Sequence, residues 1–267
     1  MAARTGSTRT RSATKGGKAR DLRAGAALLW GEQDQPTRGP KPSLTPRRIA
    51  AAAVALADAE GLEAASMSKV GAEFGVSAMA LYRYVPGKTE LVELMVEAVL
   101  EDVPDLTAAG DGWRDQLKEW ARRSLDVYRA HPWLLAATAM RRQLVGPNQL
   151  GWLDAALAAL EPAGLTGPER HQIFLLVIGH VRNLAQQALD ADEDHDREWA
   201  ALTGEILDRH ADRYPAVSRA LADGAFAPST VDQLDFGLDR VLDGVDALIG
   251  DRAVPTAPPG PVRQARA

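Results

Sequence analysis

Residues 66–85 read SMSKVGAEFGVSAMALYRYV, and they predict two very short helices that meet at a tight turn. The first helix has an apolar stripe at the spacing of one helical face, made of Met67, Val70 and Phe74. Gly75 can adopt the positive φ angle that ends this helix. Val76 fills the corner, and the hydroxyl of Ser77 can cap the second helix.

The second helix is predicted to be only half buried. Ala80, Leu81 and Val85 can turn inward, which leaves a set of small, aromatic and cationic residues near the surface: Ala78, Met79, Tyr82, Arg83 and Tyr84. Two short helices at a steep angle, the second with such a surface, are typical of a helix-turn-helix that reads DNA. A helical hairpin inside a larger bundle has the same pattern, so this stretch alone favours DNA reading only modestly.

The flanking sequence favours a compact four-helix domain over residues 43–103. Thr45 and Pro46 form a strong helix start, because threonine caps the helix and proline fits its first position. Gly61 ends that helix. After a break at Pro86-Gly87, an amphipathic fourth helix is expected from about Lys88 to Asp102.

With these flanks, the segment resembles the tetracycline-repressor (TetR) family of bacterial transcription regulators. The resemblance covers residues 43–103, and Val85 departs from the Phe of many members. A weaker likeness at residues 236–244 resembles the last helix of the tetracycline-repressor branch, whereas residues 104–230 match too diffusely to imply a ligand. The motifs that carry the resemblance are Ile49-x4-Val54, Gly61-Leu62, Ser66-Met67-x2-Val70-Gly71, Phe74-Gly75-Val76-Ser77, Leu81-Tyr82-Arg83-Tyr84-Val85 and Gly87-Lys88-x2-Leu91.

Composition agrees with a two-part intracellular protein. The 267 residues exceed a typical domain of ~100–150 residues, and 46% are hydrophobic, which can support a sizeable core. Cysteine is absent, which excludes disulfides and cysteine-bound metals and fits a reducing cytosol. No apolar run approaches the ~18 residues of a membrane span, and residues 24–30 lack the cleavage site of a signal peptide. We expect a cytoplasmic protein without a membrane contact.

The net charge of −5 is unevenly distributed along the chain. Residues 1–42 carry +6, residues 43–103 carry −4, and residues 104–267 carry −7. Most acids of the second segment lie on the expected fourth helix, facing away from DNA, whereas its cations surround the helix-turn-helix. Residues 1–42 are predicted to be a basic, flexible arm or a simple solubilising tail, with Arg38 and Lys41 near enough to reach DNA. Residues 251–267 are predicted to be a disordered tail.

The expected DNA contacts follow from the position of the second helix in a major groove. Its first residues meet base edges: Ser77 offers a hydroxyl, and Met79 and Ala80 suit thymine methyl groups, with Ala78 beside them. Arg83 could reach guanine or phosphate. The family resemblance further implies phosphate contacts by Tyr82, Tyr84 and Lys88, and base or backbone contacts by Ser68 and Lys69 on the preceding helix.

Residues 104–250 are predicted to form a helical effector-binding and dimerisation domain. Helices are expected at about 111–130, 132–143, 147–163, 168–190, 196–213 and 231–250, with proline and glycine at the breaks. The body of the helix at 168–190 is apolar almost all round, and the last helix has a wide apolar face. Pairing both with their copies would give a four-helix dimer interface, although central helices of a monomeric core would show the same pattern.

This domain is also predicted to hold a small-molecule pocket. Large aromatic or flexible side chains and a few polar groups in apolar surroundings have the chemistry of a ligand cavity, although each alone is more often structural. The candidate ligand contacts are Trp113, His131, Trp133, Met140, Trp152, Phe174, His180 and Asn183.

The sequence contains no pattern of an enzyme, a cofactor site or a metal site. The acidic run at residues 190–196 lacks the ligand spacing of a calcium loop and is interpreted as a solvated surface loop. We therefore expect an all-α homodimeric repressor that binds a palindromic operator and responds to an unknown small molecule. Two other classes stay open: an architectural or constitutively bound DNA-binding protein without an effector, and a helical protein-interaction module.

Overall fold

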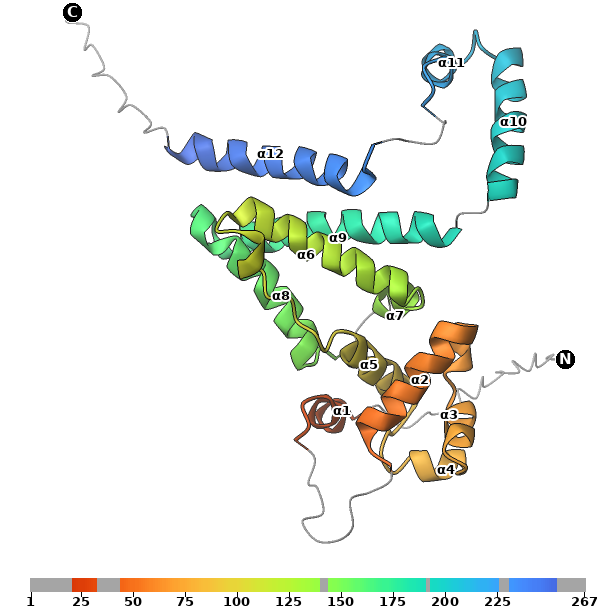
Figure 1. Cartoon of the computed structure of the whole chain (residues 1–267), viewed down its shortest axis with the longest axis vertical. Coiled ribbons are helices and arrows are strands. Elements are labelled where there is room, and N and C mark those ends of the chain that lie inside the picture. Colours follow the sequence, from red (N-terminus) through yellow and green to blue (C-terminus); the bar gives the residue numbers. More distant parts are fainter. Residues whose placement is uncertain (1–20, 33–43, 140–143, 191–192, 226–230, 254–267) are drawn as a thin grey trace, which may run out of the picture.

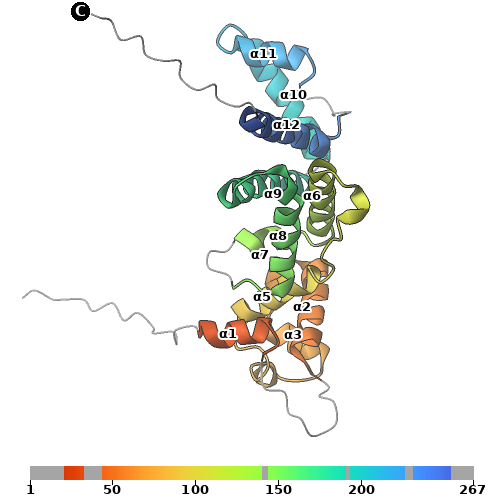
Figure 2. The ribbon, with the colours of Figure 1, turned by 90° about the vertical axis from the view of Figure 1, so that its left-hand side faces the viewer.

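The computed structural model describes residues 21–32, 44–139, 144–190, 193–225 and 231–253 (Figure 1). Within these ranges every regular element is a helix, which confirms the all-α prediction. The molecule is elongated, with an N-terminal unit made of helices α1–α5 at one end (Figure 2). Helices α6–α12 form a C-terminal unit, from which α10 and α11 project at the opposite end.

The N-terminal unit contains the expected four helices and one more. Helices α2 and α5 pack against each other around a small apolar core that includes Ile49, Val70, Leu81 and Met95, all fully buried. The bounds are α1 Leu22–Leu29, α2 Pro46–Glu60, α3 Met67–Glu73, α4 Ala78–Leu81 and α5 Lys88–Val99, with a 3-10 turn at Leu62–Ala64.

The ends of these helices follow local chemistry in most cases. The Thr45 hydroxyl accepts a hydrogen bond from the Arg48 N–H at 3.2 Å, and Gly61 ends α2 at a φ of 86°. Ser66 caps α3 through the Lys69 N–H at 3.3 Å. The prediction for Ser77 is wrong, because its hydroxyl makes no capping hydrogen bond although the residue directly precedes α4. The side chain is instead exposed to solvent.

Glycines allow α3 and α4 to meet closely. Gly75 has a φ of 65°, as the turn requires. A Cβ atom at Gly71 would lie only 2.8 Å from the Val76 carbonyl oxygen, so a larger residue there would push the turn away from α3. This contact fixes the angle at which α4 is presented.

Helix α1 differs from the flexible arm predicted for residues 1–42. Its N-terminus is capped by Asp21, and Leu28 and Leu29 are buried in the common core, where α1 packs against α5. The Trp30 indole N–H also donates to the Val145 carbonyl at 3.3 Å. Two leucines and this tryptophan therefore bind the segment to the body, while Arg38 and Lys41 lie outside the described residues.

The C-terminal unit is built around the long helices α6, α9 and α12, which pack against one another, with α8 crossing toward the N-terminal unit (Figure 1). The bounds are α6 Trp113–Ala130, α7 Leu134–Ala139, α8 Pro147–Ala159, α9 Gly167–Asp190, α10 Glu193–Arg209, α11 Pro215–Ala222 and α12 Gln233–Ala253, with 3-10 turns at Thr107–Ala109 and Glu161–Ala163.

Two predictions for this unit need correction. Helix α11 was not expected, because Pro215 was interpreted only as a break, whereas proline is also well suited to open a helix. The acidic run at residues 190–196 is not a loop throughout, since α9 continues to Asp190 and α10 begins at Glu193. Acidic residues favour the first turn of a helix, where they face the positive end of its dipole.

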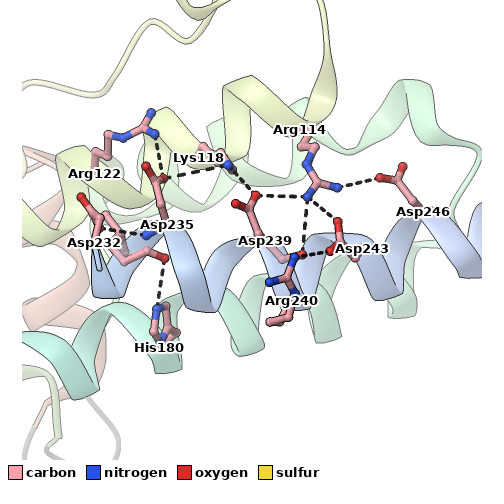
Figure 3. Close-up of polar contacts among 11 residues, drawn as sticks. Arg114, Lys118, Arg122, His180, Asp232, Asp235, Asp239, Arg240, Asp243 and Asp246 are labelled. Atoms are coloured by element: carbon pink, nitrogen blue, oxygen red, sulfur yellow. Dashed lines mark hydrogen bonds and ion pairs between the residues drawn. The ribbon is translucent and has the colours of Figure 1, made fainter. Parts of the chain in front are cut away.

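Complementary charges join α6 to α12 (Figure 3). Arg114, Lys118 and Arg122 recur every four residues on α6 and face carboxylates with the same spacing on α12. The ion pairs run in opposite directions along the two helices: Arg122 with Asp235 at 2.8 Å, Lys118 with Asp239 at 2.5 Å, and Arg114 with Asp243 at 2.6 Å and Asp246 at 2.7 Å. Bonds from Lys118 and Arg114 lower the pKa of Asp239, and bonds from Arg240 and Arg114 lower that of Asp243.

Replacing Arg114 with alanine is expected to loosen α12. Arg114 contacts three carboxylates of α12, so its loss should lower the unfolding midpoint by about 2–4 °C in a thermal scan. Arg240→Ala is the matched control, because Arg240 pairs with Asp243 within α12 itself and joins no second helix. An equal decrease in both variants would contradict a role in joining the helices.

Candidate DNA-reading surface and effector cavity

Helix α4 presents the side chains that the sequence assigns to base reading. Met79 is 74% exposed and Tyr82 is 45% exposed, and Ser77 and Arg83 are also exposed. On the other side of the turn, Leu81 is fully buried, as is Val85; Ala78 and Ala80 are half-buried. The exposed face is therefore apolar at Met79 on α4 and cationic at Arg83 just after it, which suits contacts with thymine methyl groups and with phosphates.

Three further residues of this surface have contacts within the protein. The Lys69 ammonium pairs with Glu60 at 2.6 Å, and the Lys88 ammonium donates to the Leu62 carbonyl at 3.1 Å. Both lysine side chains are about half exposed or slightly less, so water competes for these contacts. Ser68 is exposed beside Lys69, whereas the ring of Tyr84 is half-buried against the core.

A cavity of about 410 Å³ lies in the C-terminal unit between α6, α7, α8 and α9. Its walls are mostly apolar, and three of its rings meet edge to face: Trp120 lies 6.2 Å from Trp152 and 5.6 Å from Phe174, measured between centroids. The size is typical of a site for a drug-sized ligand. The lining residues are Leu100, Trp120, Ser124, Val127, Tyr128, Leu134, Thr138, Val145, Gln149, Trp152, Leu153, Phe174, Ile178 and Arg182.

Of the predicted ligand residues, Trp152 and Phe174 line this cavity. Five others lie elsewhere, and Met140 is outside the described residues. Trp113 is half-buried near the start of α6, and Asn183 is exposed on α9. His180 lies against α12, where its Nε2 is 3.2 Å from the Gln233 carbonyl oxygen and its ring covers Gly237.

His131 and Trp133 connect the two units of the molecule rather than lining the cavity. The Trp133 indole N–H donates to Oδ1 of Asp58 on α2 at 2.7 Å, and Nδ1 of His131 lies 2.8 Å from the same oxygen. Both residues lie in the turn between α6 and α7. An aspartate of the N-terminal unit thus holds the start of the helix that carries Leu134 and Thr138 into the cavity.

Glu97 makes a second connection, at the N-terminus of α8. Its carboxylate accepts hydrogen bonds from the Asn148 N–H at 2.8 Å and the Gln149 N–H at 3.1 Å, where it faces the positive end of the α8 dipole. A Cβ atom at Gly146 would lie 2.3 Å from the carboxyl carbon, so glycine is required for this approach. Glu93 accepts from the Leu144 N–H at 2.8 Å beside it. Both acids are buried between the two units.

Trp152 belongs to both this connection and the cavity. Its ring lines the cavity, and its indole N–H donates to the carbonyl of Leu100, the residue that ends α5, at 3.1 Å. The Trp120 N–H donates to the Trp152 carbonyl at 2.8 Å, which fixes the position of that residue. Trp152 therefore connects the wall of the cavity to the end of α5.

Stability should depend on the protonation of Glu97. Burial raises the pKa of this carboxyl above 4.5, and the N–H donors at Asn148, Gln149 and Gly146 only partly offset this. Because the folded chain then holds the proton more tightly than the unfolded chain, stability falls as the pH rises from 4.5 through the raised folded pKa. The lowered pKa values of Asp239 and Asp243 act in the opposite direction in both proteins. Urea unfolding at a series of pH values should therefore show the decrease as a difference between the parent protein and Glu97→Gln. Equal pH slopes in both proteins would contradict the assignment.

Within the described residues, no group of three or more histidine and carboxylate side chains is placed to hold a metal ion. None of the helices in those ranges combines the length and apolar character needed to cross a membrane.

Comparison with known proteins finds a family model for each unit of the chain. A family model described as "Bacterial regulatory proteins, tetR family" matches residues 49–95, and one described as "Tetracyclin repressor-like, C-terminal domain" matches residues 105–249. The HTH-type transcriptional repressor DrrR1 of Streptomyces coeruleorubidus is 38% identical over 95% of this chain and 96% of its own.

Solved structures of ActR, a TetR family protein of Streptomyces coelicolor, are also similar. Its complex with actinorhodin has a TM-score of 0.66 and 25% identity, covering 79% of this chain and 99% of that one. Its complex with (S)-DNPA has a TM-score of 0.64 and 26% identity, covering 77% and 98%. With a matching family model for each unit and a relative that aligns along nearly its whole length, the chain belongs to the TetR family of DNA-binding transcriptional regulators.

Proposed function

We propose that this chain is a cytoplasmic, nucleoid-associated repressor that binds a palindromic operator as a homodimer and releases it when a small molecule enters the cavity. Residues 43–103 are the DNA-binding domain, and residues 104–250 bind the effector and form the dimer. The observation that carries the proposal is Trp152, which both lines the cavity and bonds to the end of α5. The solved complexes of the similar TetR family protein ActR with (S)-DNPA and with actinorhodin support a response to a small molecule.

In this proposal α4 enters the major groove with its N-terminal end. Met79 and its small neighbours Ala78 and Ala80 contact base edges, and the Ser77 hydroxyl is available to them. Arg83 and the aromatic hydroxyls fix the position of the helix on phosphates. Lys69 and Lys88 exchange their present partners for phosphate oxygens, which costs little because exposed ion pairs are weak.

The dimer would form through α9 and α12, which pack together and leave large apolar side chains uncovered. Leu175 and Leu176 on α9 are 45% and 58% exposed, and Phe236 on α12 is 57% exposed. Pairing these faces with a second copy would bury them in a four-helix interface. It would also present two α4 helices, which a palindromic site requires at a separation of about 34–36 Å.

An effector would act by changing that separation. In this proposal a ligand bound between α6, α7, α8 and α9 moves the cavity wall at Trp152 and the N-terminus of α8. Trp152 is hydrogen-bonded to Leu100 at the end of α5, and the start of α8 is hydrogen-bonded to Glu97 of α5. Such a ligand lowers operator affinity only if it prefers the spacing that does not fit the operator. The cavity disfavours the alternative of a regulator without an effector, for which a filled core would be expected.

Selection from a random DNA pool tests the function directly. The full chain should enrich a two-fold symmetric sequence, and DNase footprints should cover two half-sites one helical turn apart. The control is the Met79→Glu variant in the same selection, which shows whether DNA is enriched through surfaces other than α4. An asymmetric consensus, or no enrichment at low salt, would contradict the proposal and favour a protein-interaction module.

Phosphate contacts should be visible in the salt dependence of binding. Arg83→Ala and Lys88→Ala should each weaken operator binding at low salt and reduce the slope of log affinity against log salt by about 1. The control is Arg129→Ala, which removes a cation that lies far along α6 and pairs with Asp126 on the surface. If Arg83→Ala and Lys88→Ala both bind the operator with unchanged affinity, these two residues do not contact DNA.

A further inference from the structure

Among the described residues that line the cavity, one carries a cationic side chain, Arg182 on α9. Its guanidinium donates to the Tyr128 hydroxyl at 2.9 Å, to the Thr138 hydroxyl, and to the Leu135 carbonyl at 3.1 Å. It also lies over the Tyr128 ring, with its carbon 5.5 Å from the centroid. All these partners are neutral, and the ion pairs found among the described residues include none with Arg182. Its charge is thus held in place beside apolar walls without a carboxylate.

A polar group without a hydrogen bond lines the same cavity. The hydroxyl of Ser124 on α6 is buried and has no hydrogen-bond partner among the residues that the structure describes. A hydroxyl in apolar surroundings is normally satisfied, because leaving it without a bond costs free energy. The cavity therefore has two unmet requirements, a counter-charge for Arg182 and a hydrogen-bonding atom for Ser124.

The remaining walls define the rest of the ligand. The rings of Trp120, Trp152 and Phe174 form a rigid cluster, and Leu134, Leu153 and Ile178 complete an apolar lining. Aromatic rings pack favourably against such edges and faces, and a flat ligand would cover them without polar groups of its own there. This lining disfavours a sugar or another ligand with hydroxyls on every side.

We propose that the effector is an aromatic anion: a flat ring system whose carboxylate, sulfonate or ionised phenol pairs with Arg182 and accepts a hydrogen bond from Ser124. The guanidinium keeps N–H groups beyond those used within the protein, so it can form a charge-assisted hydrogen bond to the ligand. This inference concerns the effector class of the proposed repressor and rests on that function.

Two fluorescent probes that differ by one charged group test this directly on the full chain without DNA. Anilinonaphthalene sulfonate is an aromatic anion, and N-phenylnaphthylamine has the same rings without the sulfonate. The anion should bind one per chain and on the order of tenfold more tightly than the neutral probe, which is the effect of one charge-assisted hydrogen bond. Arg182→Met should abolish this preference and leave the affinity for the neutral probe unchanged.

Two further variants separate ligand recognition from folding. Ser124→Ala removes a hydroxyl that has no hydrogen bond within the described part of the chain, so the protein should stay folded and lose several-fold affinity for the anion only. Arg123→Met removes an exposed arginine that pairs with Glu119 on the same helix, outside the cavity, and should change the affinity for neither probe. This control detects the anion binding to exposed apolar surface.

The inference is overturned if the parent protein binds the neutral probe as tightly as the anion, or binds neither at one per chain. It is also overturned if Ser124→Ala leaves both affinities unchanged while Arg182→Met weakens them equally. Operator binding is measured separately. A chain that binds its operator but prefers the neutral probe keeps the proposed function and contradicts this inference. A chain that prefers the anion but binds no operator contradicts the proposed function, and the cavity is then a site for aromatic anions without a role as an effector site.

Discussion

Met79→Glu should reduce operator affinity by about 100-fold or more, because it places a carboxylate against the negatively charged groove in place of an apolar base contact. Met79 is 74% exposed and contributes little to the core, so the variant should fold and dimerise normally. Gel-shift titration measures the affinity, while circular dichroism and analytical ultracentrifugation check the fold and the dimer.

Met79→Gln is the matched control for this substitution, because it has nearly the same length without the charge. It should lose only about tenfold, the value of a single base contact. Full binding by the glutamate variant would show that α4 does not enter the groove. Unfolding of that variant would show that Met79 belongs to the core.

Glu97→Ala is expected to separate the two units of the protein. It removes the acceptor for two N–H groups at the start of α8, and leaving these partly buried donors unpaired should cost about 2–4 kcal/mol of unfolding free energy. Urea unfolding followed by circular dichroism should then show two transitions, or one broadened transition, in place of a single cooperative one.

Two other variants test this connection. Gly146→Ala should have a similar effect, since its methyl group would displace the Glu97 carboxyl. Glu101→Ala is the control, because Glu101 follows α5 but pairs only with exposed Arg47 and should change stability by no more than ~1 kcal/mol. If Glu97→Ala and Glu101→Ala have equal effects, Glu97 does not join the units.

The N-terminal unit was largely predictable because its signals are local. Thr45 at a helix start, Gly61 at a helix end and Gly75 at the turn each act within a few residues, and the structure agrees with all three. The same holds for α9, expected at 168–190 and found at Gly167–Asp190. Helix α11 was missed although Pro215 begins it, because proline also interrupts helices and was interpreted that way here.

The cavity and the connections between units could be predicted only in part, because they depend on residues far apart in sequence. Trp152 and Phe174 were found from their chemistry alone, but His131 and Trp133 have the same chemistry and bond to Asp58. Glu97 resembles any solvated acid until α8 is placed beside it. The basic residues of α6 and the acids of α12 were predictable in principle, because both sets recur every four residues.

The spacing of four residues between these charges does not by itself fix the register of α12 against α6. If α12 slid along α6 by four residues, about 6 Å, most carboxylates would meet a new cation, so the ion pairs do not select one register. His180 does select it. Its ring occupies the place of a Cβ atom at Gly237, and a slide of four residues would bring Gln233 or Val241 under the imidazole. The contact between His180 and Gly237 thus determines the register of α12.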